Sequence, residues 1–248
     1  MAKVVIVTGG SRGIGAATAR LAAARGYDVC VNYLGAADAA RAVAAEIEQA
    51  GSRALVVQGD TSDESDVERL FATVDRELGP IAALVNNAGI VGATSRVADV
   101  TMATLRRTFD INVIGCFLCA RAAVRRMSTA NGGRGGAIVN LSSAAATLGS
   151  PNEFVHYAAS KGAIDSFTIG LAREVAREGI RVNAVTPGLI ETDIHASVGD
   201  PGRLARLAPA VPMGRGGTAD EVAETILWLM SDAASYVTGA NLRVSGGR

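Results

Sequence analysis

A tyrosine and a lysine four residues apart, Tyr157 and Lys161, combine the side chains needed to move a proton. The apolar pattern around them predicts a helix over residues 155–178, where residues four apart share a face. A free phenol has a pKa of about 10. A neighbouring ammonium favours the phenolate and lowers that pKa. The pair could therefore give a proton to a carbonyl oxygen, or take one from an alcohol.

The scarcity of lysine favours a special role for Lys161. Of the 24 basic residues, 22 are arginines, and Lys3 and Lys161 are the only lysines. The alternative is an ordinary tyrosine and lysine on a surface helix, which their spacing alone does not exclude. A lysine presents a compact charge with three donors, so it can bind ribose hydroxyls and polarise a tyrosine together. The composition favours this functional interpretation.

A second chemical feature is the glycine-rich segment TGGSRGIG at residues 8–15. Glycines allow a tight turn and a close approach of backbone to phosphate, and the start of the following helix supplies free N–H groups and a positive dipole end. The alternative is a purely structural turn. Four glycines in seven residues exceed what a turn needs. The segment also joins the first expected strand to the first expected helix, where a dinucleotide belongs.

The elements that must position these residues alternate along the chain. Short apolar runs predict strands at residues 3–8, 28–33, 53–58, 81–85, 137–141, 180–185 and 241–244. Helical patterns lie between them at residues 14–25, 36–50, 67–78, 101–129 with a break near Asn112, 155–178 and 218–230, where Thr218 and Glu221 form a capping box. This order predicts an α/β fold with one doubly wound parallel sheet, a Rossmann fold of about seven strands with helices on both faces.

No linker or repeat divides the chain, so we expect a single dinucleotide-binding domain over residues 1–248. Residues 188–212, which include His195, are long and weakly periodic. Segments of this kind in compact domains are usually binding loops. We expect this segment, together with residues 144–156, to select the substrate.

Composition excludes several other classes of protein. The 24 acidic and 24 basic residues balance, which argues against nucleic acid or a membrane surface as partner. No apolar run is long enough to span a bilayer, and the sequence indicates a cytoplasmic protein. Cys116 and Cys119 have the spacing of a redox or metal motif, but no second Cys or His pair completes a site. We interpret them as small buried hydrophobes and expect no metal.

Together these motifs resemble those of the short-chain dehydrogenases/reductases. The glycine turn is followed in order by the segment NNAG at residues 86–89, Asn112, Ser143, the Tyr157–Lys161 pair and the segment PG at residues 187–188. The likeness covers essentially the whole chain. It implies an oxidoreductase that transfers a hydride between NADP(H) or NAD(H) and a carbonyl or secondary alcohol.

The resemblance implies a role for each member of the reacting set. Tyr157 would be the general acid/base and Lys161 its partner. Ser143 would hold the substrate oxygen, with Ser142 as the competing candidate. Asn112 would position the lysine through a water molecule. We interpret His156 as a substrate-loop or structural residue, because it adjoins Tyr157 and neighbouring residues in a helix do not face the same way.

The same resemblance implies a set of cofactor contacts. Asp60 would meet the adenine, the residues after the fourth strand would pack on the adenosine side, and Ile190 and Thr192 would meet the nicotinamide amide. The complete expected set is Gly9, Ser11, Arg12, Gly13, Ile14, Gly15, Asn32, Asp60, Thr61, Asn87, Ala88, Gly89, Tyr157, Lys161, Pro187, Gly188, Ile190 and Thr192.

The end of the second strand predicts a preference for NADP(H). NAD sites place an acid there to hold the ribose 2′-hydroxyl, whereas NADP sites use a basic residue for the 2′-phosphate. Here the strand ends in Val-Asn-Tyr, and Asp28 and Asp38 lie away from its end. Asn32 could donate to a phosphate, and Arg12 could pair with one as a bidentate cation. NAD(H) remains the alternative, and a solvated turn residue remains the alternative for Arg12.

Several functional questions remain open at this level. A dinucleotide-binding sensor or scaffold could use the same fold without turnover. A 3-oxoacyl thioester is an alternative substrate. Arg134 would then contact an acidic carrier protein, although Glu178 lies where a second basic residue is expected. We expect a homotetramer, or else a dimer. The expected helix over residues 218–230 has more apolar surface than one helix face needs for its own core, from Ile226, Leu227, Trp228, Leu229 and Met230.

Overall fold

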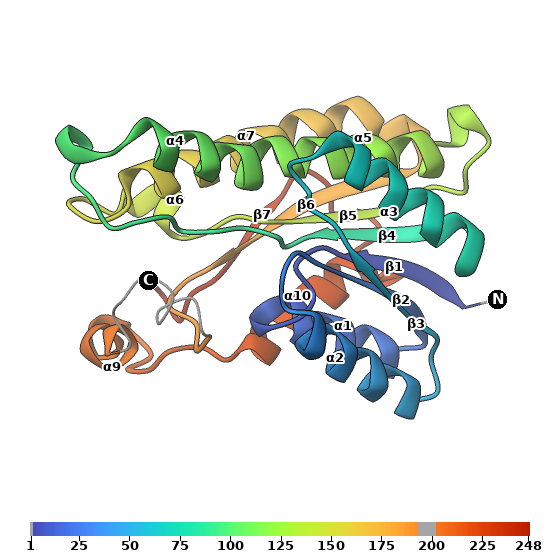
Figure 1. The fold of residues 1–248 in the computed structure, drawn as a ribbon, viewed down its shortest axis with the longest axis horizontal. Helices are drawn as coiled ribbons and strands as arrows, with labels where there is room; N and C mark the ends of the chain where they lie inside the picture. Colours follow the sequence, from blue (N-terminus) through green and yellow to red (C-terminus); the bar gives the residue numbers. More distant parts are fainter. Residues whose placement is uncertain (1, 193–201) are drawn as a thin grey trace.

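Seven parallel strands form one sheet in the order β3-β2-β1-β4-β5-β6-β7 (Figure 1). The computed structural model describes residues 2–192 and 202–248. The strands are β1 (Lys3–Val7), β2 (Tyr27–Tyr33), β3 (Ala54–Gln58), β4 (Ile81–Asn86), β5 (Gly136–Leu141), β6 (Ile180–Pro187) and β7 (Asn241–Val244). The predicted doubly wound parallel sheet is confirmed.

Helices cover both faces of this sheet and form two separate cores. The helices are α1 (Gly13–Ala24), α2 (Ala37–Gln49), α3 (Glu64–Glu77), α4 (Met102–Phe109), α5 (Gly115–Met127), α6 (Ala145–Leu148), α7 (Val155–Val175), α9 (Arg203–Leu207) and α10 (Ala219–Met230). In Figure 1, α3, α5 and α7 lie above the sheet and α1, α2 and α10 lie below it. None of the helices in the described ranges is long and apolar enough to cross a membrane.

The side chains of β1 alternate between two apolar cores, which explains why the strand has no polar face. Val5 and Val7 pack in the core under α1 and α10, whereas Val4 and Ile6 pack in the core with α3 and α5. Side chains of a strand alternate between the two faces, and a parallel sheet covered on both faces buries every one of them.

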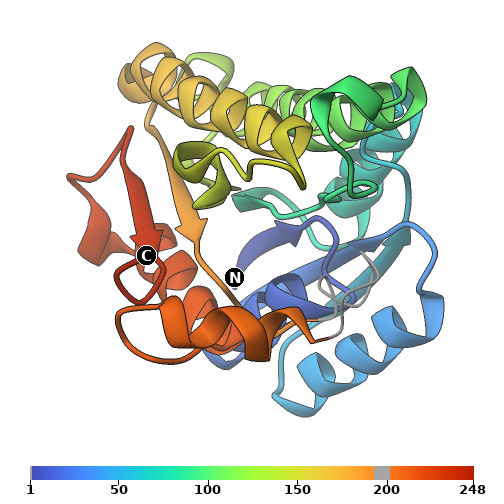
Figure 2. The ribbon, with the colours of Figure 1, turned by 90° about the vertical axis from the view of Figure 1, so that its left-hand side faces the viewer.

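The strand order reverses direction between β1 and β4, which leaves a crevice at the carboxyl ends of these strands. Thr8 continues β1 by donating from its backbone N to Val85 O at 3.0 Å. Beyond this point the segments after β1 and β4 diverge. The glycine turn follows β1, Asn87 follows β4, and Ser143 follows β5. The topology therefore brings the predicted chemical residues together at the carboxyl ends of the strands, at the end of the molecule where α9 lies (Figure 2).

The helix predicted over residues 101–129 is interrupted as expected near Asn112. A π-helical turn, Asp110–Ile114, joins α4 to α5. Such wide turns are rare and are frequent at functional sites. The helix predicted over residues 155–178 ends earlier, at Val175, and a 3₁₀ turn leads to Gly179, whose φ of +76° ends the segment. The capping box of α10 is present, with Thr218 and Glu221 each bonding the other's backbone N.

The two predicted substrate loops contain short helices. The loop at residues 144–156 includes α6 and the first residues of α7, and the loop at residues 188–212 includes α9. Periodicity does not reveal helices of four or five residues. Part of the second loop, residues 193–201 with His195, lies outside the described residues.

Candidate active site

Tyr157 and Ser143 face each other across the carboxyl end of β5. Tyr157 lies in the first turn of α7, and its side chain is close enough to that of Ser143 for the two to interact. Burial raises the pKa of Tyr157, and the interaction with Ser143 offsets only part of that effect. The phenol is therefore protonated at neutral pH. Ser142, the competing candidate, instead donates to the Lys161 backbone carbonyl at 3.3 Å.

Lys161 is almost fully buried one turn further along α7. Its Nζ donates to the Leu141 carbonyl oxygen at 2.6 Å and lies 5.8 Å from the centroid of the Tyr157 ring. Burial lowers the pKa of Lys161 to about 8. The expected lowering of the Tyr157 pKa by Lys161 is not found in the protein by itself, because burial dominates the titration of both groups.

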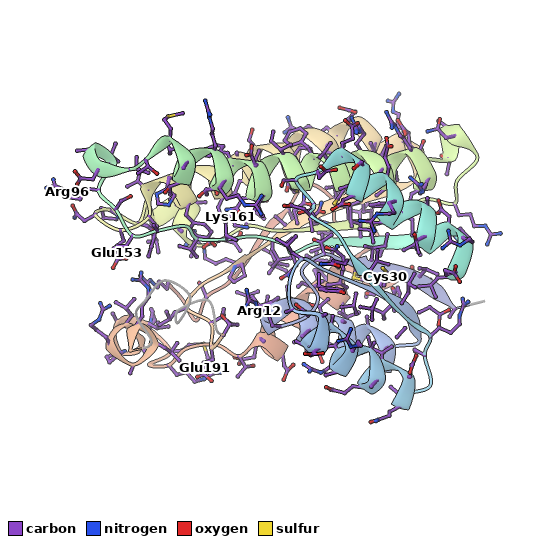
Figure 3. All side chains as sticks on the ribbon, viewed as in Figure 1. Arg12, Cys30, Arg96, Glu153, Lys161 and Glu191 are labelled. Carbon is purple, nitrogen blue, oxygen red and sulfur yellow. The ribbon has the colours of Figure 1, made fainter. Side chains whose placement is uncertain are left out.

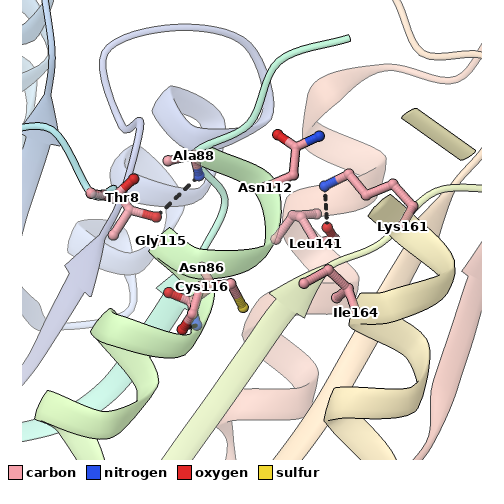
Figure 4. Close-up of a pocket in the computed structure, with 10 residues that line it drawn as sticks. Thr8, Asn86, Ala88, Asn112, Gly115, Cys116, Leu141, Lys161 and Ile164 are labelled. Carbon is pink, nitrogen blue, oxygen red and sulfur yellow. Dashed lines mark hydrogen bonds between the residues drawn. The ribbon is translucent and has the colours of Figure 1, made fainter. Parts of the chain in front are cut away.

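Asn112 extends from the π-helical turn toward the same lysine (Figure 4). Its amide accepts a bond from Ile90 N at 2.8 Å and donates to Ile90 O at 2.9 Å and Ser160 Oγ at 3.0 Å. A cavity of about 10 Å³, lined by Asn112, Lys161 and Thr8 among others, lies between these elements. A space of this size and polarity is close to the minimum for one water molecule.

The glycine turn leaves the start of α1 open. Gly9 and Gly13 have φ values of +61° and +54°, which other residues rarely adopt. A Cβ on Gly15 would lie 2.4 Å from Gly9 O, so a side chain there would break the turn. The Asn87 amide closes the turn from β4 by donating to Thr8 O and Gly9 O.

These residues fit the diphosphate of a dinucleotide. No side chain caps the N-terminus of α1, and no acid lies in its first turn, so its N–H groups and positive dipole end face outward. A Cβ on Gly89 would lie 3.2 Å from Asn112 Oδ1 and 3.5 Å from Lys161 Nζ, so only a glycine leaves the space beside these two groups clear.

Asn32 has a role that differs from the expected one. The side chain is buried, and its Nδ2 donates to Val57 O at 3.3 Å and Gly59 O at 3.1 Å. Its Oδ1 accepts a bond from Gly9 N at 3.4 Å. The expectation that this amide is free to donate to a phosphate is therefore wrong. Asn32 instead fixes the glycine turn to the ends of β2 and β3.

Arg12 is exposed at the edge of the same turn, and its side chain makes no hydrogen bond or ion pair with residues 2–192 or 202–248 (Figure 3). The acids nearest in sequence are occupied elsewhere. The Oδ2 atom of Asp28 accepts from both Nε and Nη2 of Arg53 at the opposite end of β2, and Asp38 pairs with Arg41 on α2. Neither of these two acids pairs with Arg12, which is the charged residue of the glycine turn at residues 8–15.

Asp60 and Thr61 follow β3 beside the crevice. Asp60 accepts bonds from Ser62 N at 2.9 Å and Arg107 Nη2 at 3.0 Å, which hold its pKa below the usual range despite partial burial. Thr61 packs so closely on α5 that a Cβ on Gly115 would lie 2.9 Å from its Oγ1. The segment is thereby fixed against the helix that follows Asn112.

One cleft of about 450 Å³ joins the reacting residues to the walls around them. Ser143, Tyr157 and Lys161 line its inner end. Seven of the expected cofactor residues outside that set also line it: Ile14, Asn87, Gly89, Pro187, Gly188, Ile190 and Thr192. The remaining expected residues lie outside this cleft, along the turn and the ends of β2, β3 and β4: Gly9, Ser11, Arg12, Gly13, Gly15, Asn32, Asp60, Thr61 and Ala88.

Several contacts of the site had no signal in the sequence. The Leu141 carbonyl that holds Lys161 is a backbone atom, and the Asn112 bond to Ser160 joins residues 48 positions apart. Asn86 does not face the adenosine side, because its Nδ2 donates to the buried Asn140 Oδ1 at 3.0 Å. His156 is structural, with its Nε2 3.1 Å from the Val91 carbonyl oxygen.

Two other sequence interpretations, the cysteine pair and Arg134, can be compared with the structure. Cys116 and Cys119 are free and buried, and burial raises the pKa of Cys116 to about 12, so its thiol is unreactive. Arg134 precedes β5 and lies at the opposite edge of the sheet from Tyr157. It does not border the cleft of its own chain.

The apolar surface expected on α10 is largely absent. Ile226, Leu227, Leu229 and Met230 are buried in the core of the chain itself, and Trp228 alone of these five is exposed, at 40 %. The larger exposed apolar group, which the sequence did not reveal, lies on α4, α5 and α7 with the turn between α4 and α5: Met102, Phe109, Ile114, Phe117 and Ile169.

Comparison with known proteins gives consistent matches over the whole chain. A family model described as enoyl-(acyl carrier protein) reductase matches residues 9–248. The chain is 55 % identical to the uncharacterized oxidoreductase YgfF of Escherichia coli over 99 % of both chains. It is 39 % identical to a 3-oxoacyl-[acyl-carrier-protein] reductase of Synechocystis and 42 % identical to a cis-4-hydroxycyclohexanecarboxylate dehydrogenase of Sinomonas cyclohexanicum, each over 99 % of this chain and 96 % of the relative.

Solved structures agree. A short-chain type dehydrogenase/reductase from Mycobacterium marinum superposes with a TM-score of 0.93 at 35 % identity, covering 99 % of this chain and 94 % of that one. A blue fluorescent protein from a metagenomic library, solved in complex with NADPH, gives 0.89 at 37 % identity, covering 99 % and 97 %. The chain belongs to the short-chain dehydrogenase/reductase family, and it is an oxidoreductase.

Proposed function

We propose that this enzyme transfers a hydride between NADP(H) and a carbonyl or secondary alcohol, with Tyr157 as general acid/base. The observation that carries the proposal is the group of Tyr157, Ser143 and Lys161 lining one cleft, with Lys161 Nζ 5.8 Å from the centroid of the Tyr157 ring. In the direction of reduction, NADPH supplies the hydride. Ser143 donates to the carbonyl oxygen, and Tyr157 delivers the proton to it.

Lys161 and Asn112 act behind this pair. In our proposal Lys161 keeps its charge near the phenol, binds ribose hydroxyls and stabilises the phenolate left after proton transfer. Asn112 orders the small polar cavity next to Lys161 Nζ, through which a water molecule would restore the proton. The expected cofactor residues of the crevice position the dinucleotide, and the loops at residues 144–156 and 188–212 select the substrate.

The cofactor preference rests on Arg12 and on the missing acid at the end of β2. An exposed guanidinium in the glycine turn is well suited to a 2′-phosphate, because it can bind two phosphate oxygens at once. A relative of known structure at 37 % identity holds NADPH. NAD(H) is the alternative. A 3-oxoacyl thioester remains an alternative substrate, since one relative is a 3-oxoacyl reductase.

We propose a homotetramer as the working assembly, with a dimer as the alternative. Exposed apolar side chains lie on α4, α5 and α7, where the Phe117 ring contacts the half-buried Phe167 ring at a tilt, with centroids 3.9 Å apart. Trp228 on α10 and Leu242 on β7 are exposed on other elements. Exposed apolar side chains on separate elements suit an assembly with two kinds of interface.

Isotope transfer tests the proposal directly. The purified protein is incubated with NADPH deuterated at C4 and a panel of ketones, aldehydes and 3-oxoacyl thioesters, and the products are analysed by mass spectrometry. We expect deuterium on the former carbonyl carbon of at least one product. Binding of NADPH without transfer to any carbonyl would instead support the sensor or scaffold.

A further inference from the structure

The outer end of the cleft is charged, whereas its walls are mostly apolar. Apart from Lys161, the charged side chains that line it are Glu153, Arg203 and Arg248. They come from three separate segments: the turn before α7, the start of α9 and the end of the chain after β7. The walls between them and Tyr157 include Val91, Leu148, Phe154, Leu189 and Leu207. An occupant would meet an apolar channel with a polar group at each end.

The charges at this outer end do not cancel. Arg203 donates to both oxygens of Glu153, at 2.8 and 2.6 Å, and its guanidinium carbon lies 5.3 Å from the centroid of the Phe154 ring. This ion pair holds the pKa of Glu153 below its usual range. The pair is thus fixed in place and neutral as a unit. Arg248 adds one positive charge to it.

Arg248 is held at its backbone and not at its guanidinium. The backbone N donates to Ser245 O at 3.2 Å, and the carbonyl oxygen accepts from Ser245 Oγ at 2.6 Å and Arg243 Nη1 at 3.4 Å. For its side chain, no hydrogen bond or ion pair is found within residues 2–192 and 202–248, although it is half-buried and lines the cleft. A fixed backbone with a side chain left unbonded in a cleft is suited to a ligand anion.

A further acid among the described residues, Glu191, does not supply that anion. Glu191 is exposed and interacts electrostatically with Arg215, and it does not line the cleft. Figure 3 shows both acids toward the end of the molecule where α9 lies, with Glu153 in the upper part and Glu191 in the lower part. Arg206 and Arg248 also act on Glu153 electrostatically, which makes the surroundings of the ion pair more positive.

We propose that the substrate of this enzyme carries a carboxylate, bound by Arg248 at the outer end of the cleft while its carbonyl or alcohol lies at Tyr157. The assignment rests on the proposed hydride-transfer function and names its substrate class: an oxo acid or hydroxy acid with a small apolar body. The 450 Å³ of the cleft hold the nicotinamide end of the cofactor as well, so the substrate is small. Arg248 is then a specificity-determining residue.

Matched acids and esters test the proposal. A series of oxo-carboxylates of graded length, including 4-oxopentanoate and 4-oxocyclohexanecarboxylate, is compared with the corresponding methyl esters as substrates of wild type, Arg248→Gln, Arg248→Lys and Arg177→Gln. For the best-fitting length, we expect kcat/KM to favour the acid by about 10- to 100-fold, the usual worth of a charge-assisted hydrogen bond. Arg248→Gln should lose this ratio through KM, and Arg248→Lys should recover part of it.

Arg177 is the matched control, because it is an exposed arginine before β6 at the opposite edge of the sheet. Its replacement changes the net charge equally and should leave the ratio unaltered. An acid-to-ester ratio near one in wild type, or a ratio unaffected by Arg248→Gln, would overturn the proposal. Esters reduced without preference for acids would leave the hydride-transfer function standing and remove only the carboxylate.

Binding gives a readout that does not depend on turnover. Isothermal titration of the same acids into the protein with NADP⁺ should show binding to wild type and at least tenfold weaker binding to Arg248→Gln. Failure of every acid to bind wild type would contradict the proposal. Arg248-dependent binding without reduction of any carbonyl would support anion recognition at Arg248 and refute the proposed reaction.

Discussion

The Lys161 Nζ atom donates to the Leu141 carbonyl oxygen at 2.6 Å, so the last residue of β5 holds the buried charge of α7 in place. The strand and the helix meet at this bond, and Ser143 lies two residues further along the same strand end. The distance between the groups that polarise and protonate a substrate is therefore set by the sheet itself. A site built on a strand end is more rigid than one built on loops alone.

Removing the buried charge should stabilise the protein at neutral pH. The folded pKa of Lys161 is about 8, below the value of about 10.4 for an unfolded chain. Wild type therefore carries the full cost of the buried ammonium below pH 8, and its stability rises as pH increases from 8 toward 10.4, because the unfolded state binds more protons there. Lys161→Met has no such term.

The measurement is urea unfolding of cofactor-free Lys161→Met and wild type between pH 6 and 10. We expect the variant to have the higher free energy of unfolding at pH 7 and the difference to shrink above pH 8. A difference that is constant across this range would show that Lys161 has an ordinary pKa. A variant less stable at every pH would mean that the bond to Leu141 outweighs the desolvation cost.

Arg12→Gln should weaken NADPH more than NADH. The guanidinium is free to pair with the 2′-phosphate that NADH lacks, and a lost charge-assisted bond costs roughly 1.5–3 kcal/mol, or about 10- to 100-fold in affinity. Fluorescence titration of both cofactors measures the two dissociation constants. Arg25→Gln, at the far end of α1, is the control and removes a surface ion pair with Glu224. Equal loss for both cofactors would assign Arg12 to the diphosphate.

Asn32→Asp should chiefly destabilise the fold. From the sequence, an acid at this position would repel the 2′-phosphate and favour NADH. In the structure it would place an unpaired carboxylate against the carbonyl oxygens of Val57 and Gly59. Leaving such groups unsatisfied costs on the order of 2–4 kcal/mol. Urea unfolding at pH 7 checks this, and a shift to NADH at unchanged stability would restore the original interpretation.

The assembly should separate into smaller units when its apolar surface is charged. Light scattering at micromolar concentration should give the mass of four chains, or of two in the alternative. Phe117→Glu should lower that mass, because this exposed position beside Phe167 would then carry a charge into the contact. Arg173→Gln, an exposed change on α7, should not. A monomeric wild type would refute the proposed assembly.

The fold was accessible from the sequence because the apolar runs were short and followed by turn signals, and the central strands β1, β2, β4, β5 and β6 are buried almost throughout. The order of motifs was likewise enough to place Tyr157, Lys161, Ser143 and Asn112 at one edge. Those predictions depend on local spacing and on the common direction of parallel strands. The break at Asn112 was also predicted, although its π-helical geometry was not.

The remainder depends on contacts between distant residues. Asn32 looked like a cofactor donor because the sequence does not tell which way a side chain at a strand end points; β3 supplies the two carbonyl groups that occupy it. Ile226 and Leu227 looked like surplus apolar surface because α10 packs on α1 as well as on the sheet. The ion pair of Glu153 and Arg203 spans 50 residues and has no local signature.

The most direct test of the central claim is the turnover of Tyr157→Phe. The change keeps the ring next to Lys161 and removes only the hydroxyl that interacts with Ser143. Single-turnover oxidation of bound NADPH by the best substrate should slow by about 10²- to 10⁴-fold, the typical worth of a positioned general acid, while the dissociation constant of NADPH stays close to that of wild type. A Tyr157→Phe enzyme that turns over at the wild-type rate would contradict the account.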